Sequence, residues 1–499
     1  MGELQRSRVA RSAAQVAGGP ESESLHRLDS VPVVLRLADD SANARFCFLT
    51  ALRLALLTFG NVKVAMQRSD ATLMKKVQAL SVSMRGSDHP IQVVDATDIK
   101  DSDFVLVIGR IEVRGGRAVA VGSHGWVARV AVSGPSRDQA VILPRAASRE
   151  PNAIGSSAAA ALGIGELFLG ALGVGRPAAA FDCSFLAYET ADVGTLDIGP
   201  AIQRPITLNG IQIGAGTVGG AFDYVAHELR LEGHLAIVDP QRVGTENYGP
   251  HLLVGAADFF VPKVRLAVKR LKRLRNLRVK GYLEPVQLFV LRLGSEIPIP
   301  DVVVSGLDRA QPRHIVQRLW APLHIDMATG GVGGLQSQVL VRANPGSGRC
   351  LIEAFTVDGE EPDEERWATM TGVGTDRFSD PMSLISLADV EAAPEEKRAD
   401  LLEAHRLGQR VCNVVIASEL GARNDSTDFA AAAPFNALLA GTMAAGELMQ
   451  SRDRDRDGVF TQYNLVSRAF FSERTRSADD CECMIRHGLP KLGISQATG

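Results

Sequence analysis

The chain has 499 residues, of which 45% are hydrophobic and 22% charged, and its net charge at pH 7 is −3. This length exceeds that of one ordinary domain, so two or three globular domains with ample apolar core are expected. The nearly balanced charge argues against bulk attraction to nucleic acid or to a membrane surface. We also expect no segment that approaches the roughly 20 apolar residues of a membrane span.

The first 30 residues contain arginines but no continuous apolar stretch, so they predict no secretory signal and are interpreted as a flexible lead. A chain of this size with few cysteines does not form a disulfide framework, which favours a reducing, cytoplasmic setting. Some thiols are then available for metal binding or catalysis. The six cysteines are Cys47, Cys183, Cys350, Cys412, Cys481 and Cys483.

Two pairs of similar segments indicate an internal repeat in the chain. The small-residue segment 159–168 resembles 440–449, and the apolar strand predicted at 103–109 resembles 301–306. Only the later strand runs into an acid, Asp308. The pattern predicts two related α/β halves, of which only the second retains a nucleotide site. Chance similarity between two Ala- and Gly-rich helices is the alternative explanation for the first pair.

A glycine-rich turn follows the short apolar strand predicted at 206–213. Its glycines allow a tight turn, a close approach of the backbone to phosphate, and close packing of the next helix on the sheet. The helix expected over 217–231 then presents unpaired N–H groups and a positive dipole end to an anion. The pattern indicates a nucleotide but not its chemistry. The three glycines are Gly214, Gly216 and Gly219.

Four polar residues follow the glycine turn in a part of the chain where a dehydrogenase requires no particular residue types. Asp239 ends the apolar strand 234–238, where a carboxylate can hold ribose hydroxyls. Asn247 and Lys263 come next, and Asp308 closes a further apolar strand.

Each of the last three also has a structural alternative. Lys263 begins the basic stretch 263–280, which is interpreted mainly as a solvated surface helix. Asn247 could cap a turn, and Asp308 could cap the helix that follows it.

This order of residues resembles the adenylating family that contains the ubiquitin-activating enzymes and the bacterial ThiF and MoeB proteins. The likeness covers about residues 205–345 and returns at 430–450. It implies an α/β fold with two Rossmann-like adenylation halves, a degenerate one supporting an active one as an internal pseudo-dimer. It also implies ATP and magnesium as cofactors. The implied roles are ribose binding by Asp239, triphosphate binding by Asn247 and Lys263, and magnesium binding by Asp308.

The residue types suit adenylation of a carboxylate, which needs a backbone cradle, a lysine and a magnesium carboxylate around the α-phosphate. Two positions depart from the family pattern. Pro250 and His251 stand where the family usually has Arg and Gln, and Gln241 replaces a second acid. We expect Arg242, Arg309 or an arginine from elsewhere to compensate.

The resemblance and the composition together predict the domain boundaries. In the activating enzymes an insertion interrupts the active half, and this insertion carries the catalytic cysteine. The expected order is a flexible lead (1–30), an inactive adenylation-like domain (31–180), a linker (181–204), the first part of the active domain (205–350), a catalytic-cysteine insertion (351–430), and the second part with the C-terminal tail (431–499).

Cys412 lies inside this insertion, and Arg410 beside it favours a thiolate, so Cys412 is the predicted nucleophile for a thioester and Cys350 is second. The alternative for Cys412 is a buried small apolar residue. Cys350 with Cys481, Cys483 and one further ligand would form a zinc set, although this cysteine pattern is incomplete.

The leading hypothesis is an ATP-dependent activating enzyme that adenylates the C-terminal carboxylate of a ubiquitin-like protein and transfers it to an E2-like conjugating enzyme. The Ala-, Arg- and Gly-rich composition suggests a bacterial source, where such conjugation is associated with antiviral defence by analogy. The alternatives are sulfur-carrier activation, peptide-carboxylate adenylation and a non-catalytic nucleotide-binding scaffold. Neither nucleic acid nor a membrane is an expected partner, and further oligomerisation stays open.

Overall fold

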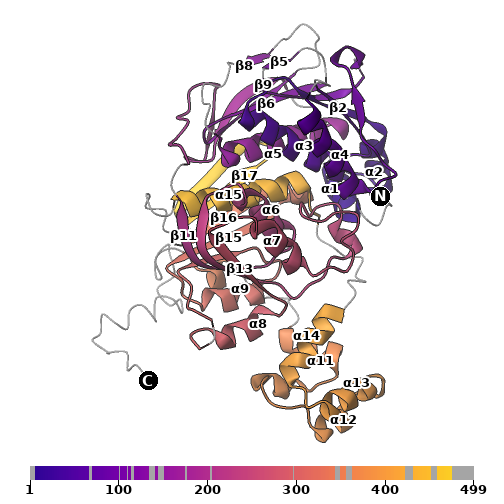
Figure 1. The fold of residues 1–499 in the computed structure, drawn as a ribbon, viewed down its shortest axis with the longest axis vertical. Helices are drawn as coiled ribbons and strands as arrows, with labels where there is room; N and C mark the ends of the chain where they lie inside the picture. The colour runs from indigo at the N-terminus through magenta and orange to yellow at the C-terminus, as the bar shows by residue number, and fades with distance from the viewer. Residues whose placement is uncertain are drawn as a thin grey trace, which may run out of the picture.

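The computed structural model describes residues 6–474, apart from short gaps, as two α/β halves and a small helical lobe (Figure 1). Each half is built on one eight-stranded sheet. The residues outside the described part of the chain are 1–5, 67–69, 101, 110, 114–116, 134–140, 144–150, 175–176, 203–204, 296, 343–348, 356–361, 422–430, 451–457 and 475–499.

The first sheet has the strand order β10-β9-β7-β6-β4-β1-β2-β3. Its central strands are short runs of valine, leucine and isoleucine, as expected of parallel strands that are covered on both faces. Strands β5 (Ile111–Val113) and β8 (Val141–Leu143) pair separately. The strands of the sheet are β1 (Pro32–Leu37), β2 (Asn61–Ala65), β3 (Gln92–Val94), β4 (Phe104–Ile108), β6 (Ala118–His124), β7 (Val127–Val132), β9 (Ala179–Ser184) and β10 (Glu189–Ala191).

The second sheet has the order β13-β12-β11-β14-β15-β16-β17-β18. Its strands are β11 (Ile206–Ile213), β12 (Leu231–Val238), β13 (Leu277–Tyr282), β14 (Val302–Ser305), β15 (Leu323–Gly330), β16 (Gln336–Arg342), β17 (Val459–Asn464) and β18 (Ala469–Arg474). Short helices on this half are α8 (Val286–Phe289), α9 (Ala310–Gln317) and α10 (Leu351–Ala354).

The two sheets have the same topology, strand for strand. In both, the first five strands of the sheet are parallel in the order third, second, first, fourth, fifth, and antiparallel strands continue from the fifth. The two sequence repeats fall on equivalent elements, α5 (Ala153–Ala171) with α15 (Pro434–Gln450) and β4 with β14. The predicted α/β fold with two Rossmann-like halves is therefore confirmed.

Small residues allow the helices of the two halves to pack closely against each other. Helix α5 contacts α15, α3 packs on α5, and α6 packs on α15 (Figure 1). Between the halves, a Cβ at Gly165 of α5 would lie 2.7 Å from the Leu465 side chain and 3.3 Å from the Phe435 ring of α15. Within the second half, a Cβ at Gly441 of α15 would lie 2.5 Å from the backbone nitrogen of Phe222 in α6, so only glycine permits this approach. The helices of both halves are α3 (Ala42–Thr58), α4 (Ala71–Arg85), α5 (Ala153–Ala171), α6 (Thr217–Ala226), α7 (Lys263–Leu271) and α15 (Pro434–Gln450).

Helix α5 has 19 residues and is long and apolar enough to cross a membrane. The expectation that no segment approaches such a span was therefore wrong for α5. The structure buries 89% of its apolar window inside the protein, because α3 and α15 cover it. Helix α5 is thus a core helix at the contact between the halves.

Residues 7–30 are not a flexible lead. They form α1 (Ser7–Ala17) and α2 (Glu21–Ser30), and Val9 and Ala13 of α1 are fully buried. The Gly333 N–H, in the turn between β15 and β16, donates a 2.9 Å hydrogen bond to Gln15 Oε1. Helix α1 therefore connects the first half to the second. The expectation failed because alanine, serine and valine, rather than long apolar side chains, form the buried face.

Two further boundaries differ from the sequence expectations. Only the first part of the basic stretch 263–280 is helical, as α7, and its last residues belong to β13 at the edge of the second sheet. Basic side chains on an edge strand discourage pairing with another chain. The expected linker 181–204 contains β10 and most of β9, so its first part belongs to the first sheet.

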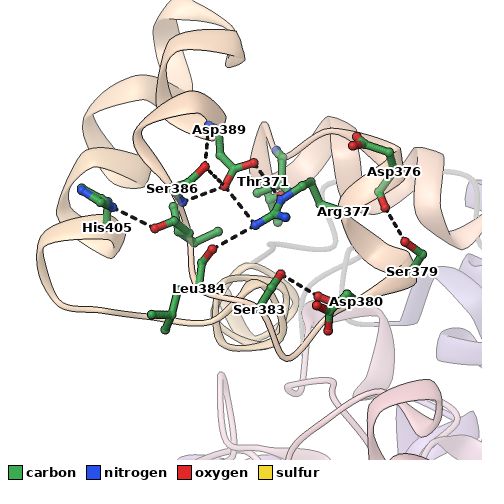
Figure 2. Close-up of polar contacts among 12 residues, drawn as sticks. Thr371, Asp376, Arg377, Ser379, Asp380, Ser383, Leu384, Ser386, Asp389 and His405 are labelled. Carbon is green, nitrogen blue, oxygen red and sulfur yellow. Dashed lines mark hydrogen bonds and ion pairs between the residues drawn. The ribbon is translucent and has the colours of Figure 1, made fainter.

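Helices α11 to α14 lie between β16 and α15 in the chain and form the lobe at one end of the molecule (Figure 1). Figure 2 shows the polar contacts that hold it: Arg377 forms an ion pair of 2.9 Å with Asp389, which also accepts a 2.7 Å hydrogen bond from the Ser386 N–H. Val373 and Leu401 belong to its separate apolar core. The helices are α11 (Asp363–Thr371), α12 (Leu387–Ala392), α13 (Glu395–Arg406) and α14 (Val411–Gly421).

A buried acid in α6 makes stability depend on pH. Asp223 is fully buried, Gln212 Nε2 donates to its carboxylate at 3.2 Å, and burial raises its pKa to about 7. The folded protein keeps a proton that the unfolded chain releases above its ordinary pKa near 3.8. The free energy of unfolding therefore falls as pH rises from about 4 to about 7.

We predict that Asp223→Asn increases the free energy of unfolding at pH 8 by on the order of a few kcal/mol and changes it little at pH 4. Denaturant unfolding of the native protein and the variant at both pH values measures this difference. Asp88→Asn, at an exposed acid, is the matched control. An equal effect of Asp223→Asn at both pH values would contradict the prediction.

Candidate nucleotide and acyl-transfer site

Three adjacent parallel strands of the second sheet end at the same level. Ile213 of β11 is aligned with Val238 of β12 and with Ser305 of β14. The loops after these strands therefore lie side by side at the carboxyl edge, where open α/β sheets bind ligands. Since the glycine turn, Asp239 and Asp308 occupy these loops, residues distant in sequence become neighbours.

A cavity of about 650 Å³ opens at this edge, a volume in the usual range for small-ligand sites. Gly219 lies behind its wall, where a Cβ would come within 2.0 Å of the Gly214 carbonyl oxygen. The predicted site residues that line the cavity are Gly214, Gly216, Asp239, Asn247, Lys263 and Asp308.

The glycines have the distinct roles that the turn requires. Gly214 has a φ of +91°, and a Cβ there would lie 2.4 Å from the Gly306 carbonyl oxygen. A Cβ on Gly216 would meet no atom within 4 Å, since this residue faces the cavity. Thr217 and Val218, the first residues of α6, also line the wall. The helix N-terminus is therefore directed at the cavity, as anion binding requires.

Asp239 is 5% exposed, and each of its carboxylate oxygens accepts a backbone hydrogen bond. Ala215 N donates to one oxygen and Gln241 N to the other, both at 2.7 Å. Burial raises the pKa of Asp239, and the nearby charge of Lys263 opposes this effect. The acid thus ties the glycine turn to the end of β12 and leaves its remaining lone pairs at the cavity.

Lys263 is 4% exposed and begins α7 at the cavity wall, so its alternative assignment to a solvated helix face is excluded. Its Nζ donates a 2.8 Å hydrogen bond to Gln241 Oε1. A neutral amide in place of an acid does not cancel the lysine charge, which therefore remains available to an anion.

Asn247 and Asp308 reach the same cavity. Asn247 is 2% exposed, and its Oδ1 accepts a 2.9 Å hydrogen bond from Gly244 N, so it both stabilises a turn and lines the cavity. Arg309, not Asp308, is the N-cap residue of α9, and the Arg309 side chain makes no cap hydrogen bond. Asp308 lies one residue before this N-cap and lines the cavity.

Arg8 of α1 is a cavity residue that the sequence reasoning missed. Burial lowers the pKa of Arg8, and the charges of Asp308 and Glu246 oppose this effect. The first half therefore supplies a cation to the cavity of the second half. The available sequence signal was the pattern of Val9, Ala10 and Ala13, which places one buried face on an N-terminal helix.

The expected compensating arginines differ in their positions. Arg309 lines the cavity. Arg242 instead lies over the Phe260 ring at 4.5 Å and donates to the Phe260 carbonyl at 2.9 Å. Arg8, Arg309 and Arg366 line the cavity and are placed to compensate, whereas Arg313, which also lines it, pairs with Asp326.

A second cavity of about 200 Å³ adjoins the first, and Ala328, Gln338 and Phe355 line both. Leu340 and Phe460 give it apolar walls, and Glu473 lies on its lining. Together the two cavities extend from the glycine turn across the face of β15 to β18.

Cys412 is the second residue of α14 and does not line either cavity. It is 8% exposed and packs with Leu288 and Trp367, while its Sγ lies 3.9 Å from Met382 Sδ. Burial raises the pKa of the Cys412 thiol, and Arg410 opposes this effect. The neighbours of Leu288 and Trp367 in the chain, Gln287 and Arg366, line the larger cavity. Helices α8 and α11 therefore separate the thiol from the nucleotide cavity.

Cys350 is fully buried at the start of α10, beside Trp320. Among the described residues, no group of three His, Cys, Asp or Glu side chains is placed to hold a metal ion. Cys481 and Cys483 lie outside the described residues, so the zinc set predicted with Cys350 stays a prediction.

The corresponding edge of the first half has different chemistry. After β1 the chain reads Ala38-Asp39-Asp40-Ser41, and Ser41 Oγ caps α3 by accepting from Ala44 N at 3.2 Å. Carboxylates in place of a glycine turn repel phosphate. This agrees with a first half that has lost its nucleotide site.

The model of the ThiF family matches residues 207–485, which is more than half of the chain. The chain belongs to the ThiF family. A second family model, the BilD N-terminal domain, matches residues 33–184. No curated protein matches the chain.

Solved structures of Escherichia coli MccB are similar over part of this ThiF-family chain. The structure with MccA-N7isoASN is 9% identical with a TM-score of 0.35, covering 56% of this chain and 67% of that one. The structure with ATP is 11% identical with a TM-score of 0.33 and the same coverage. Because these scores are low, the assignment depends on the family match.

Membership of the ThiF family supports an adenylating enzyme that uses ATP with magnesium. The cavity fits these groups, since it combines backbone N–H donors and cationic side chains with the Asp308 carboxylate. The cations would meet phosphate, and Asp308 would hold the metal ion.

We predict that Arg8→Ala weakens binding of ATP with magnesium about tenfold or more, because a charge-assisted contact to phosphate is lost. Isothermal titration calorimetry measures this binding without an acyl substrate. Arg11→Ala is the matched control, because Arg11 lies on the same helix but pairs with Glu21 at 3.0 Å. Equal affinity of both variants for ATP would contradict a role for Arg8 in the cavity.

Proposed function

We propose that this protein activates the C-terminal carboxylate of a ubiquitin-like protein with ATP, holds the acyl group on Cys412 as a thioester, and passes it to an E2-like conjugating enzyme. The observation that carries the first step is the convergence of the glycine turn, Lys263, Asp308 and Arg8 on one cavity. Each group suits a part of a nucleoside triphosphate and its metal ion.

In the first step a carboxylate oxygen of the substrate attacks the α-phosphorus of ATP. The bond between this phosphorus and the bridging oxygen breaks, and pyrophosphate leaves with the electron pair. Positioning and charge neutralisation account for most catalysis of this type. The α6 N-terminus, Lys263 and Arg8 orient and neutralise the phosphates, and magnesium adds positive charge when it is bound at Asp308.

The smaller cavity supports a route for the acyl substrate. It joins the nucleotide cavity at Ala328 and Gln338, and its lining combines apolar side chains with three charged ones, Asp326, Arg349 and Glu473. An extended C-terminal segment that enters here would bring its terminal carboxylate to the nucleotide. The ubiquitin-like identity of this substrate is part of the proposal.

In the second step the Cys412 thiolate attacks the acyl carbonyl, a thioester forms, and AMP leaves. The thiol is buried behind α8 and α11, so the step requires these helices to move relative to α14, together with the segment around Met382, so that the sulfur reaches the cavity. Arg410 then favours the thiolate. Transfer to the thiol of the conjugating enzyme follows by exchange of one thioester for another.

The burial of Cys412 also favours the alternative function. A cysteine whose pKa is raised behaves as a small apolar residue, and adenylation of a sulfur carrier or a peptide carboxylate does not need it.

We infer a cytoplasmic bacterial conjugation system, with a part in antiviral defence, as the setting of the main proposal.

The deciding experiment is a non-reducing gel of the protein incubated with ATP, magnesium and a candidate ubiquitin-like protein. We predict a thiol-sensitive adduct that Cys412→Ala abolishes and Cys350→Ala retains, because Cys350 is completely buried whereas Cys412 is 8% exposed and has the charge of Arg410 beside it. Release of pyrophosphate is measured in the same samples, and Asp308→Asn is expected to reduce it by about 10²-fold or more.

The possible results separate the proposals. An adduct that Cys412→Ala leaves intact overturns the assignment of the nucleophile. Pyrophosphate release without an adduct overturns thioester formation and supports the sulfur-carrier or peptide alternative. Binding of ATP without pyrophosphate release, across candidate substrates, supports a nucleotide-binding scaffold.

A further inference from the structure

His251 occupies a family position that usually carries glutamine, and the structure gives it a defined contact to the glycine turn. The side chain is fully buried, and its Nε2 lies 2.9 Å from the Ala215 carbonyl oxygen. Leu253 N donates to its Nδ1 at 3.2 Å. Since Nδ1 accepts this bond, Nε2 carries the ring proton and donates to Ala215.

The ring is neutral under ordinary conditions. Burial lowers the pKa of His251 to about 4, and the charges of Lys263 and Arg8 act in the same direction. The imidazole therefore adds no charge to the cavity, and its contribution must come from the geometry of the hydrogen bond.

That hydrogen bond determines which way a peptide unit faces. Ala215 N donates to Asp239 at 2.7 Å, and Ala215 O accepts from His251, so the peptide units on both sides of Ala215 are held. In a trans peptide the carbonyl of Ala215 and the N–H of Gly216 point in opposite directions. Gly216 lines the cavity, whereas His251 and Ala215 do not. Because His251 holds the Ala215 carbonyl on the side away from the cavity, the Gly216 N–H is directed into the cavity.

Gly220 is adapted to this ring. A Cβ at Gly220 would lie 2.3 Å from His251 Cε1 and 3.0 Å from its Nδ1. Only glycine in the first turn of α6 leaves room for the imidazole. Gly220 and His251 are therefore one packing unit on the side of the turn that faces away from the cavity.

We propose that His251 is a positioning residue that holds the Ala215–Gly216 peptide so that its N–H binds a phosphate of the nucleotide. The proposal rests on the proposed function, because it deepens the description of the same site. Without the imidazole N–H, this peptide can rotate and present its carbonyl oxygen, which repels phosphate.

The test is the affinity for ATP with magnesium, measured by isothermal titration calorimetry on the full chain. His251→Leu removes the donor and is expected to weaken binding about tenfold. His251→Gln keeps an N–H that can reach Ala215 O, so we expect its affinity to stay within about threefold of native. Thermal unfolding of each variant shows whether it is folded at the temperature of the titration.

His227→Leu is the matched control, since His227 lies at the other end of α6 and burial likewise lowers its pKa to about 4. It is expected to leave the affinity for ATP unchanged. Gly220→Ala forces the ring out of place and should weaken binding as His251→Leu does. The double variant Gly220→Ala/His251→Gln should bind ATP more tightly than Gly220→Ala alone.

Native affinity of folded His251→Leu, or equally weak binding by His251→Gln and His251→Leu, would overturn the proposal. ATP binding needs no acyl substrate, so this result is separate from the proposed activity. A native protein that binds ATP but releases no pyrophosphate contradicts the proposed function alone.

Discussion

The close packing of small-residue helices between the two halves is the constraint on which the site depends. Helices α5 and α15 lie against each other, and Gly441 allows α15 to approach the backbone of α6. Helix α6 begins at the glycine turn, so this contact holds the turn from behind. The same association brings α1 of the first half to the cavity of the second. A larger side chain at Gly441 would displace α6 and, with it, the glycine turn.

The net charge of the cavity is little changed by its departures from the family pattern. The chain lacks the usual arginine at Pro250, but it also lacks the usual second acid at Gln241. One positive and one negative charge are lost together, and Lys263 pairs with a neutral amide instead of a carboxylate. The departures therefore alter the partners of the charged groups more than they alter the total charge.

Much of the second half could be predicted from its sequence, because short-range patterns specify it. The strand 206–213 has its own apolar pattern, and the glycine turn has its own backbone requirement. The repeat predicted two equivalent halves, since α5 and α15 share small residues at the same place in the topology. The spacing of four polar residues predicted one nucleotide site, and all four line one cavity: Asp239, Asn247, Lys263 and Asp308.

The remaining features depend on contacts that no local pattern encodes. Helix α1 is buried by small side chains, so its sequence resembles a solvated lead, and Arg8 gains its position only through the association of the halves. The burial of Cys412 depends on Leu288 and Trp367, which lie far from it in the chain. Arg242 carried the same sequence signal as Arg309, yet an adjacent aromatic ring turns it away from the cavity.

The covalent fusion of the two halves has a consequence for how they can diverge. In a homodimer each substitution occurs in both copies, so an acid in the glycine turn would damage every site at once. In this chain Asp39 and Asp40 occupy the turn of one half while the other half keeps its glycines. The fusion also holds Arg8 at the cavity at any protein concentration, because dilution cannot separate two parts of one chain.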